Sequence, residues 1–324
     1  MRRASALTLL LGVAALVAII AYAGGAAVEQ AVLRVGIVGL VLVALIHLPV
    51  IGTTGSAWYV IGGQLPGASP WKFIWARYVR EATAEVLPFS QLGGMVAGAR
   101  TLALTGLQSL PVTATLLADV IIEQLAKIPY VLAGALLLLL GGHAAPVRLL
   151  AATLLPIGVL ALLVSVGRKR ASALLGRSAE ALARRWPALR GQGAASLQGL
   201  FGRLFRWDRR TLGALATHTV GWALGAAETW VACQLMGVAV SPAEALIIDS
   251  LFCGLRTFAF AVPAALGVQE AGYVLVCALV GVPAAPAVAL SLVRRVRELL
   301  VGVPALGIWQ LLEGGRALAK QSDK

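Results

Sequence analysis

Long apolar runs, each close to the thickness of a bilayer, alternate with short polar or basic stretches along this chain of 324 residues. A helix rises about 1.5 Å per residue, so about 20 apolar residues are needed to cross the hydrocarbon core. Runs of this kind predict about six full spans, at 7–23, 35–61, 112–140, 147–166, 212–236 and 288–312. The pattern therefore predicts an all-α, polytopic integral membrane protein.

Two further apolar segments, 75–107 and 243–282, are too long for one span and are interrupted by proline and glycine. Proline removes a backbone donor and clashes with the preceding turn, so neither segment is expected to form one continuous helix. A shift of 175 positions superposes matching residues, namely Pro88 on Pro263, Gly106 on Gly281, Pro111 on Pro286 and Glu123 on Glu298. Matched interruptions predict an internal repeat, with approximate halves 64–140 and 241–312, and are typical of a transporter's binding site.

Composition supports a membrane protein and leaves little sequence for a soluble domain. Hydrophobic residues make up 59% of the chain, charged residues 13%, and the mean hydropathy is +0.87, whereas a soluble domain is about a quarter charged. The net charge of +13 would suit nucleic acid, but 11 of the 27 lysines and arginines lie within 168–210. Such a cluster is typical of a cytoplasmic loop beside anionic lipid head groups. We therefore expect one membrane domain over 1–324 and no nucleic-acid partner.

The basic clusters also predict the topology. Every cluster falls on the cytoplasmic side when Met1 starts there and each broken segment is re-entrant, which also places the C-terminus in the cytoplasm. Three full crossings then separate the broken segments, so the two halves are inverted relative to each other. Segments that cross fully as helix pairs would keep this inversion, and both arrangements stay open. Residues 1–23 form either a retained span, which we favour, or a cleaved signal peptide.

Charged residues recur at helical spacing inside the apolar segments. A charge at the bilayer centre costs about 2.5–3.5 kcal/mol on the insertion scale, so it has to face protein or water. Arginines there would bind an anionic head group, and acids would balance them or carry protons. Salt bridges that only join helices are the alternative. The candidate substrate-binding and transport residues are Arg77, Arg80, Glu81, Glu85, Pro88, Gly94, Arg100, Asp119, Glu123, Pro263, Gly267, Glu270, Arg294, Arg295 and Glu298.

Other polar residues carry weaker predictions. Glu228 stands alone in its span and fits either role, whereas Glu244 and Asp249 are expected near the membrane interface. The chain has three histidines, His47, His143 and His218. They lack metal-ligand spacing, so neither a metal nor a cofactor is expected. No catalytic motif is recognisable, and the three cysteines are expected to be small core residues.

Motifs in both halves carry a family resemblance over nearly the whole chain. The second half contains Pro263, Gly267-Val268-Gln269-Glu270 and, in a Leu/Ser-rich span, Arg294-Arg295. The first half contains Glu85, Pro88, Gly93-Gly94 and Arg100. The chain thereby resembles the membrane domain of lysylphosphatidylglycerol synthases and their flippase-like relatives, most of all the hopanoid-biosynthesis-associated, HpnL-like branch. The resemblance implies lipid translocation or export in a bacterial inner membrane, with Glu270, Arg294 and Arg295 as motif positions.

Two features depart from the family pattern. Many relatives carry an acid shortly after the glycine pair of the first motif, where this chain has Met95, the residue that the 175-residue shift pairs with Glu270. The halves are therefore chemically unequal at this point, which argues against symmetric ion coupling. Synthase members attach a soluble aminoacyl-transferring domain after the membrane part. Because this chain ends at Lys324, lipid aminoacylation is not expected.

These observations together predict a lipid translocase or transporter. It would move an amphiphilic lipid, either a hopanoid or an anionic phospholipid, between leaflets or toward export. The head group would pass through a polar cavity while the tail stays in the bilayer. Membrane lipids are the expected partners, and lipid-biosynthesis enzymes are a further class to test. The alternatives are an integral-membrane enzyme acting on lipid phosphates or glycosyl carriers, and a non-transporting subunit of a lipid-synthesis complex.

Overall fold

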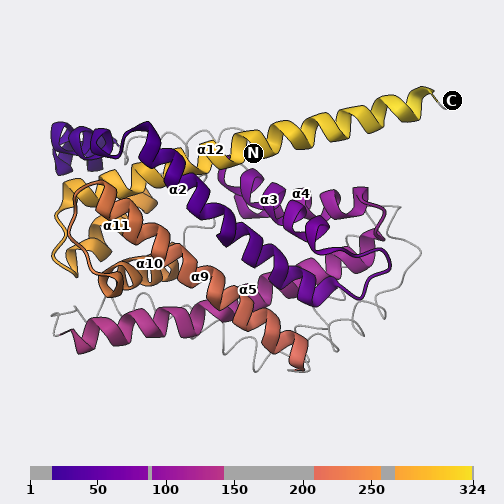
Figure 1. Ribbon diagram of the computed structural model, residues 1–324, viewed down its shortest axis with the longest axis horizontal. Coiled ribbons are helices and arrows are strands. Elements are labelled where there is room, and N and C mark those ends of the chain that lie inside the picture. Colours follow the sequence, from indigo (N-terminus) through magenta and orange to yellow (C-terminus); the bar gives the residue numbers. More distant parts are fainter. Residues whose placement is uncertain (1–16, 87–89, 142–207, 257–266, 323–324) are drawn as a thin grey trace.

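The computed structural model describes residues 17–86, 90–141, 208–256 and 267–322 (Figure 1). All regular secondary structure in these ranges is helical, which confirms the all-α prediction for the described part of the chain. Several predicted features lie wholly or mostly outside the described residues, namely Pro88, Pro263, the span 147–166 and the basic loop 168–210.

Two helices in the described part of the chain are long and apolar enough to cross a membrane. They are α2 (Gly25–Gly62) and α5 (Ser109–Leu140), whose most apolar windows have mean hydropathies of 2.5 and 1.6. These helices contain the predicted spans 35–61 and 112–140. A polytopic membrane fold is consistent with this result, and the number of full spans stays a prediction.

Glycines set the start and the bend of α2. Gly24, with φ of 87°, separates α2 from a helical stretch over 17–23, and Gly36, with φ of 61°, bends the helix internally. Glycine adopts positive φ without the steric penalty that a Cβ atom would add. The apolar sequence is continuous across Gly24, but the helix is not.

The first broken segment forms two helices that pack against each other, α3 (Pro70–Val86) and α4 (Ser90–Leu104). Gly94 makes this packing close, because a Cβ atom there would lie 2.4 Å from the carbonyl oxygen of Arg80. One turn later, a Cβ atom on Gly98 would lie 2.9 Å from the Cβ atom of Arg80. Small residues four apart let helix backbones approach in membrane proteins. Gly94 therefore serves helix packing directly beneath an arginine of the candidate site.

Four helices belong to the second half of the described chain. They are α9 (Arg209–Leu235), α10 (Pro242–Arg256), α11 (Val268–Ala278) and α12 (Ala284–Ser322). Asp208 caps α9 by accepting hydrogen bonds from the backbone N–H groups of Arg210 and Thr211. The bond from Thr211 is the main reason why the pKa of the Asp208 carboxyl lies below its usual value. The cap fixes where α9 begins.

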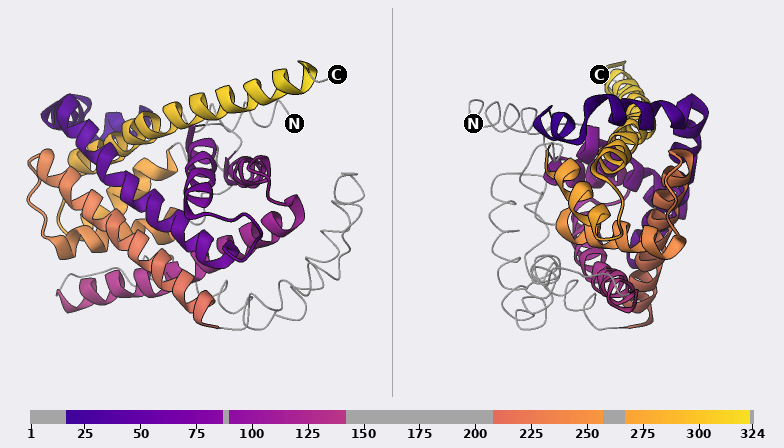
Figure 2. Two further views of the ribbon diagram at one scale, coloured as in Figure 1. Left: turned by 45° about the vertical axis from the view of Figure 1, so that its right-hand side comes forward. Right: turned by 90° about the vertical axis from the view of Figure 1, so that its left-hand side faces the viewer.

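The helices form a bundle with α2 and α9 at its centre. These two helices lie side by side and run in opposite directions (Figure 1). Figure 2 shows α12 and α5 on opposite sides of this pair. Helix α12 of the second half packs on α2 and α3 of the first half. Helix α5 of the first half packs in the same way on α9 and α10 of the second half. Polar side chains that point between these layers are therefore enclosed by both halves.

The distribution of polarity is the reverse of that in a soluble protein. Large apolar side chains are exposed along α2, α5 and α12, with Val38 at 83% exposure as an example. The interior combines an apolar core with buried ionisable side chains, of which Asp119, His218 and Glu270 are completely buried. Acids and bases are almost never fully buried in soluble domains unless they are paired, and inside membrane proteins they face the bundle interior. The interior of this bundle is therefore the candidate site.

Candidate functional site

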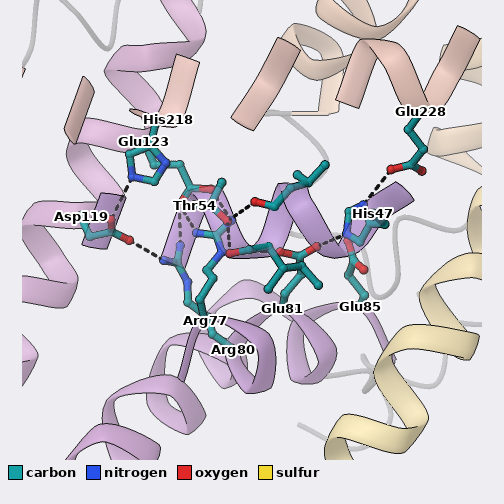
Figure 3. Close-up of polar contacts among 12 residues, drawn as sticks. His47, Thr54, Arg77, Arg80, Glu81, Glu85, Asp119, Glu123, His218 and Glu228 are labelled. Atoms are coloured by element: carbon teal, nitrogen blue, oxygen red, sulfur yellow. Dashed lines mark hydrogen bonds and ion pairs between the residues drawn. The ribbon is translucent and has the colours of Figure 1, made fainter. Parts of the chain in front are cut away.

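Two arginines of α3 pair with two acids of α5. Arg77 donates two hydrogen bonds to the carboxylate of Glu123, both 2.8 Å long (Figure 3). Arg80 donates to Glu123 over 2.8 Å and to Asp119 over 2.9 Å. Asp119 and Glu123 are one turn apart on α5, so both carboxylates face the two arginines. Paired, charge-assisted bonds of this kind are the strong ones, because the planar guanidinium matches the carboxylate.

His218, on α9, extends this arrangement into the second half of the chain. Its Nε2 atom lies 2.9 Å from Oδ1 of Asp119, and both side chains are completely buried. Asp119 therefore faces Arg80 on one side and an imidazole on the other. A carboxylate has two oxygens and several lone pairs, so it can accept both contacts. The histidine ties α9 to α5 at the level of the two arginines.

His47, on α2, occupies the middle of the site. Its Nδ1 atom lies 2.7 Å from Oε2 of Glu228, and its Nε2 atom lies 2.6 Å from Oε1 of Glu81 (Figure 3). Arg297 also places NH1 at 3.0 Å from Nε2 of the same ring. Because Glu81 is four residues from Arg77, with 3.5 Å between Nε and Oε2, His47 connects the α3–α5 arrangement to α9 and α12.

Arg294 organises the part of the site that belongs to the second half. Its NH2 group donates to Oδ1 of Asp249, to the hydroxyl of Thr229 and, over 3.2 Å, to the carbonyl oxygen of Gly225. Tyr130 donates a 2.7 Å hydrogen bond to the other carboxylate oxygen of Asp249. Asp249 is buried in the bundle because α10 packs between α5, α9 and α11. Its expected place near the membrane interface stays a prediction.

Glu85 has long contacts with its two arginine partners. One oxygen of Glu85 lies 3.5 Å from Arg256, and the other lies 3.6 Å from Arg297. The side chain of Arg256 is about one third exposed, at 32%, and belongs to the last turn of α10. Glu85 is therefore paired over longer distances than Asp119 and Glu123, and its partner Arg256 is partly accessible to solvent.

These contacts form one connected set, which we call the central ion network. Among the described residues it contains His47, Arg77, Arg80, Glu81, Glu85, Asp119, Glu123, His218, Glu228, Asp249, Arg256, Arg294 and Arg297. Five arginines face six carboxylates, so the formal charge is −1 when both histidines are neutral. No group of three or more metal-ligating residues occurs in the described part of the chain. Contacts between arginine and carboxylate and between carboxylate and histidine hold the network together.

Some candidate residues lie outside the central ion network. Glu270 accepts hydrogen bonds from Arg295 over 2.6 Å and from Ser291 over 3.1 Å. It also accepts one from the backbone N–H of Gly267, at the start of α11. This second-half motif is thus a cap for α11 that is tied to α12. Arg100 is exposed and pairs with Glu313, away from the interior.

The structure thus brings together much of the predicted site. The candidates in the central ion network are Arg77, Arg80, Glu81, Glu85, Asp119, Glu123 and Arg294. Glu298 is buried on α12, one turn from Arg294. The candidate set lacks six members of the network, namely His47, His218, Glu228, Asp249, Arg256 and Arg297. Each of the two histidines occurs singly in an apolar helix, so no local pattern marks it.

Comparison with known proteins identifies one family. The family described as the lysylphosphatidylglycerol synthase TM (transmembrane) region matches residues 7–305. No curated protein and no solved structure gives a significant match. The family match covers all members of the central ion network and all of the described helices except the last part of α12.

Proposed function

Because the chain belongs to the family of the lysylphosphatidylglycerol synthase transmembrane region, we propose that it is a translocase that moves an amphiphilic lipid between membrane leaflets. The observation that carries this proposal is the central ion network, enclosed between the two halves of an apolar bundle. An enclosed polar path beside apolar walls suits a molecule that has a charged head and apolar tails. The tails can stay in the bilayer while the head group passes the network.

The arginines favour an anionic phospholipid as the cargo. Guanidinium groups bind phosphate with two parallel hydrogen bonds. Arg256, on α10, and Arg297, on α12, both face Glu85 at 3.5–3.6 Å. These distances exceed a good hydrogen bond, so a phosphate can replace the carboxylate there at little cost. The HpnL-like resemblance favours a hopanoid instead, and an exchange assay with labelled phospholipid and labelled hopanoid distinguishes the two cargoes.

We further propose that the two halves form an inverted repeat. Helices α2 to α5 and α9 to α12 follow in the same order, and α2 runs opposite to α9 (Figure 1). The pairing between halves is reciprocal, since α3 packs on α12 as α10 packs on α5. Gly106 and Gly281, which the 175-residue shift superposes, have φ of +94° and +76° just before α5 and α12. An inverted repeat around a central site supports alternating access.

A transport assay with matched arginine variants tests the proposal. The purified chain is reconstituted into phosphatidylethanolamine/phosphatidylglycerol vesicles that carry fluorescent phosphatidylglycerol, and a membrane-impermeant quencher reports the labelled lipid that stays inside. Arg294→Gln is expected to slow the exchange at least about tenfold, because it removes a charge-assisted contact of about 1.5–3 kcal/mol. Arg100→Gln is the control, since Arg100 lies on the exterior, and it should behave like the wild type. Equal exchange in all three proteins would contradict the proposal.

Two further arms separate the alternatives. A fluorescent hopanoid replaces the labelled phospholipid in one arm, and faster exchange of that probe would assign the cargo to hopanoids. Mass spectrometry of the vesicle lipids after incubation forms the other arm, because a new lipid product would favour an enzyme.

We also propose a bacterial inner-membrane location with both termini in the cytoplasm. Reporter fusions to the C-terminus that are active only outside the cytoplasm check the orientation.

A further inference from the structure

His47 is held by three side chains from three different helices. Glu81 of α3 and Glu228 of α9 lie 2.6 and 2.7 Å from its two ring nitrogens. Arg297 of α12 lies 3.0 Å from Nε2, the nitrogen that also faces Glu81. His47 therefore sits where α2 meets one helix of its own half and two helices of the other half.

Counting protons shows that these contacts cannot all be hydrogen bonds at once. Each of the two short contacts between the ring and a carboxylate needs one proton, because an ionised carboxylate only accepts. With both carboxylates ionised, His47 must carry a proton on each nitrogen. The N–H group of Arg297, however, needs a lone pair on Nε2, because arginine is always a donor. Nε2 can therefore serve Glu81 when it is protonated or Arg297 when it is not.

We propose that His47 is a proton-binding site that exchanges Glu81 for Arg297 as the partner of Nε2 when the proton leaves. In this step the Nε2–H bond breaks, its electron pair stays on Nε2, and the proton moves to Oε1 of Glu81. Arg297 then donates to the new lone pair. Glu81 is the most exposed of the three partners, with 15% side-chain exposure against 3% for Arg297 and 1% for Glu228. Glu81 therefore provides the way out for the proton.

The surrounding charges make this proton consequential. The groups that contact His47 directly or through one partner are Arg77, Glu81, Glu85, Glu228, Arg294 and Arg297. Glu123 follows beyond Arg77, and Glu298 is buried and follows Arg297 in the sequence. With His218 neutral, the central ion network changes from a formal charge of 0 to −1 once the proton has passed from His47 to Glu81 and has left Glu81. An anionic head group is therefore admitted more easily to the protonated site. This coupling of the proton to the lipid rests on the proposed function.

Nitrogen NMR of the full chain in lipid nanodiscs tests proton binding without any transport. The chain has three histidines, and His47→Gln identifies the signal of His47 by its loss, while the other two signals report that the variant is folded. We expect both ring nitrogens of His47 to be protonated at low pH and one proton to leave as the pH rises from about 5 to 10. Arg297→Gln should move this transition to higher pH and Glu81→Gln to lower pH. A ring that stays singly protonated throughout would overturn the proposal.

Transport in a pH gradient then tests the coupling. In vesicles with fluorescent phosphatidylglycerol, a gradient should shift the labelled lipid toward one leaflet with the wild type, and His47→Gln should abolish that shift. Lipid exchange that ignores the gradient in both proteins would overturn the coupling. A His47 ring that loses a proton in a wild type that moves no lipid would support the proton site, overturn the coupling and refute the proposed function. The two failures are therefore distinguishable.

Discussion

Replacing the Arg80–Asp119 pair separates a transport role for the central ion network from a role in assembly alone. Asp119→Asn removes a charge that lies 2.9 Å from Arg80 and is completely buried. Removing one partner of a buried ion pair costs about 3–5 kcal/mol. Because Glu123 remains 2.8 Å from Arg80, we expect a loss near about 3 kcal/mol. At about 2–4 °C per kcal/mol, the Tm should fall by about 6–12 °C in a thermal unfolding assay of the purified protein.

The double variant Arg80→Met/Asp119→Asn makes the decisive comparison. Both charges are now absent, so the free energy of unfolding should return to within about 1 kcal/mol of the wild-type value. Replacing both partners of a buried ion pair together often has this result. The amide introduced on α5 would still offer His218 a hydrogen bond. Exchange of fluorescent phosphatidylglycerol should nevertheless fall at least about tenfold, because the head group has lost an arginine. A double variant that is both stable and fully active would refute a transport role for this pair.

Three further predictions follow from the geometry. Glu228→Gln removes the carboxylate shared by His47 and two arginines, so exchange of the labelled phospholipid should fall at least about tenfold, whereas Glu313→Gln should leave exchange unchanged. Gly94→Ala should lower the free energy of unfolding by about 1–3 kcal/mol, because α4 must move away from α3. Gly52→Ala should raise the free energy of unfolding by about 0.5–1 kcal/mol, because Gly52 lies in α2 and a Cβ atom there would have nothing within 4 Å. Thermal unfolding measures both glycine variants, and the same Tm for the two variants would contradict this account.

The sequence predicts local features of this protein well. Apolar length places the helices around 35–61 and 112–140, because helix extent depends mainly on neighbouring residues. Spacing of four residues puts Arg77 and Glu81 on one helix face, and the structure has them paired at 3.5 Å. Gly94, a candidate transport residue, packs against the backbone of α3, a contact that the sequence does not reveal, and its part in transport stays a prediction.

Contacts between helices are what the sequence does not reveal. Arg100 shares its segment with interior residues, but α4 buries Ala97 and Thr101 and turns the intervening arginine outward. His47 and Glu228 are 181 positions apart and meet only because α2 packs along α9. A single polar residue in an apolar helix has no periodic partner, so its face cannot be recognised before the packing is known. His47, His218 and Glu228 are hidden from sequence reasoning for this reason.

The two halves match in charge at Glu123 and Glu298 but differ where their main ion pairs are formed. In the first half, α3 carries Arg80 and α5 carries its partner Asp119. In the second half, α10 carries Asp249 and α12 carries its partner Arg294. The 175-residue shift superposes Asp119 on Arg294, so equivalent positions have opposite charge. In the proposed inverted repeat, identical halves would make the inward-facing and outward-facing states equal in energy. Opposite charges remove that equality, and an anionic head group then meets a different field from each side of the membrane. Such a bundle favours one of its two states, whereas net movement in one direction would need an energy source such as the proposed proton coupling.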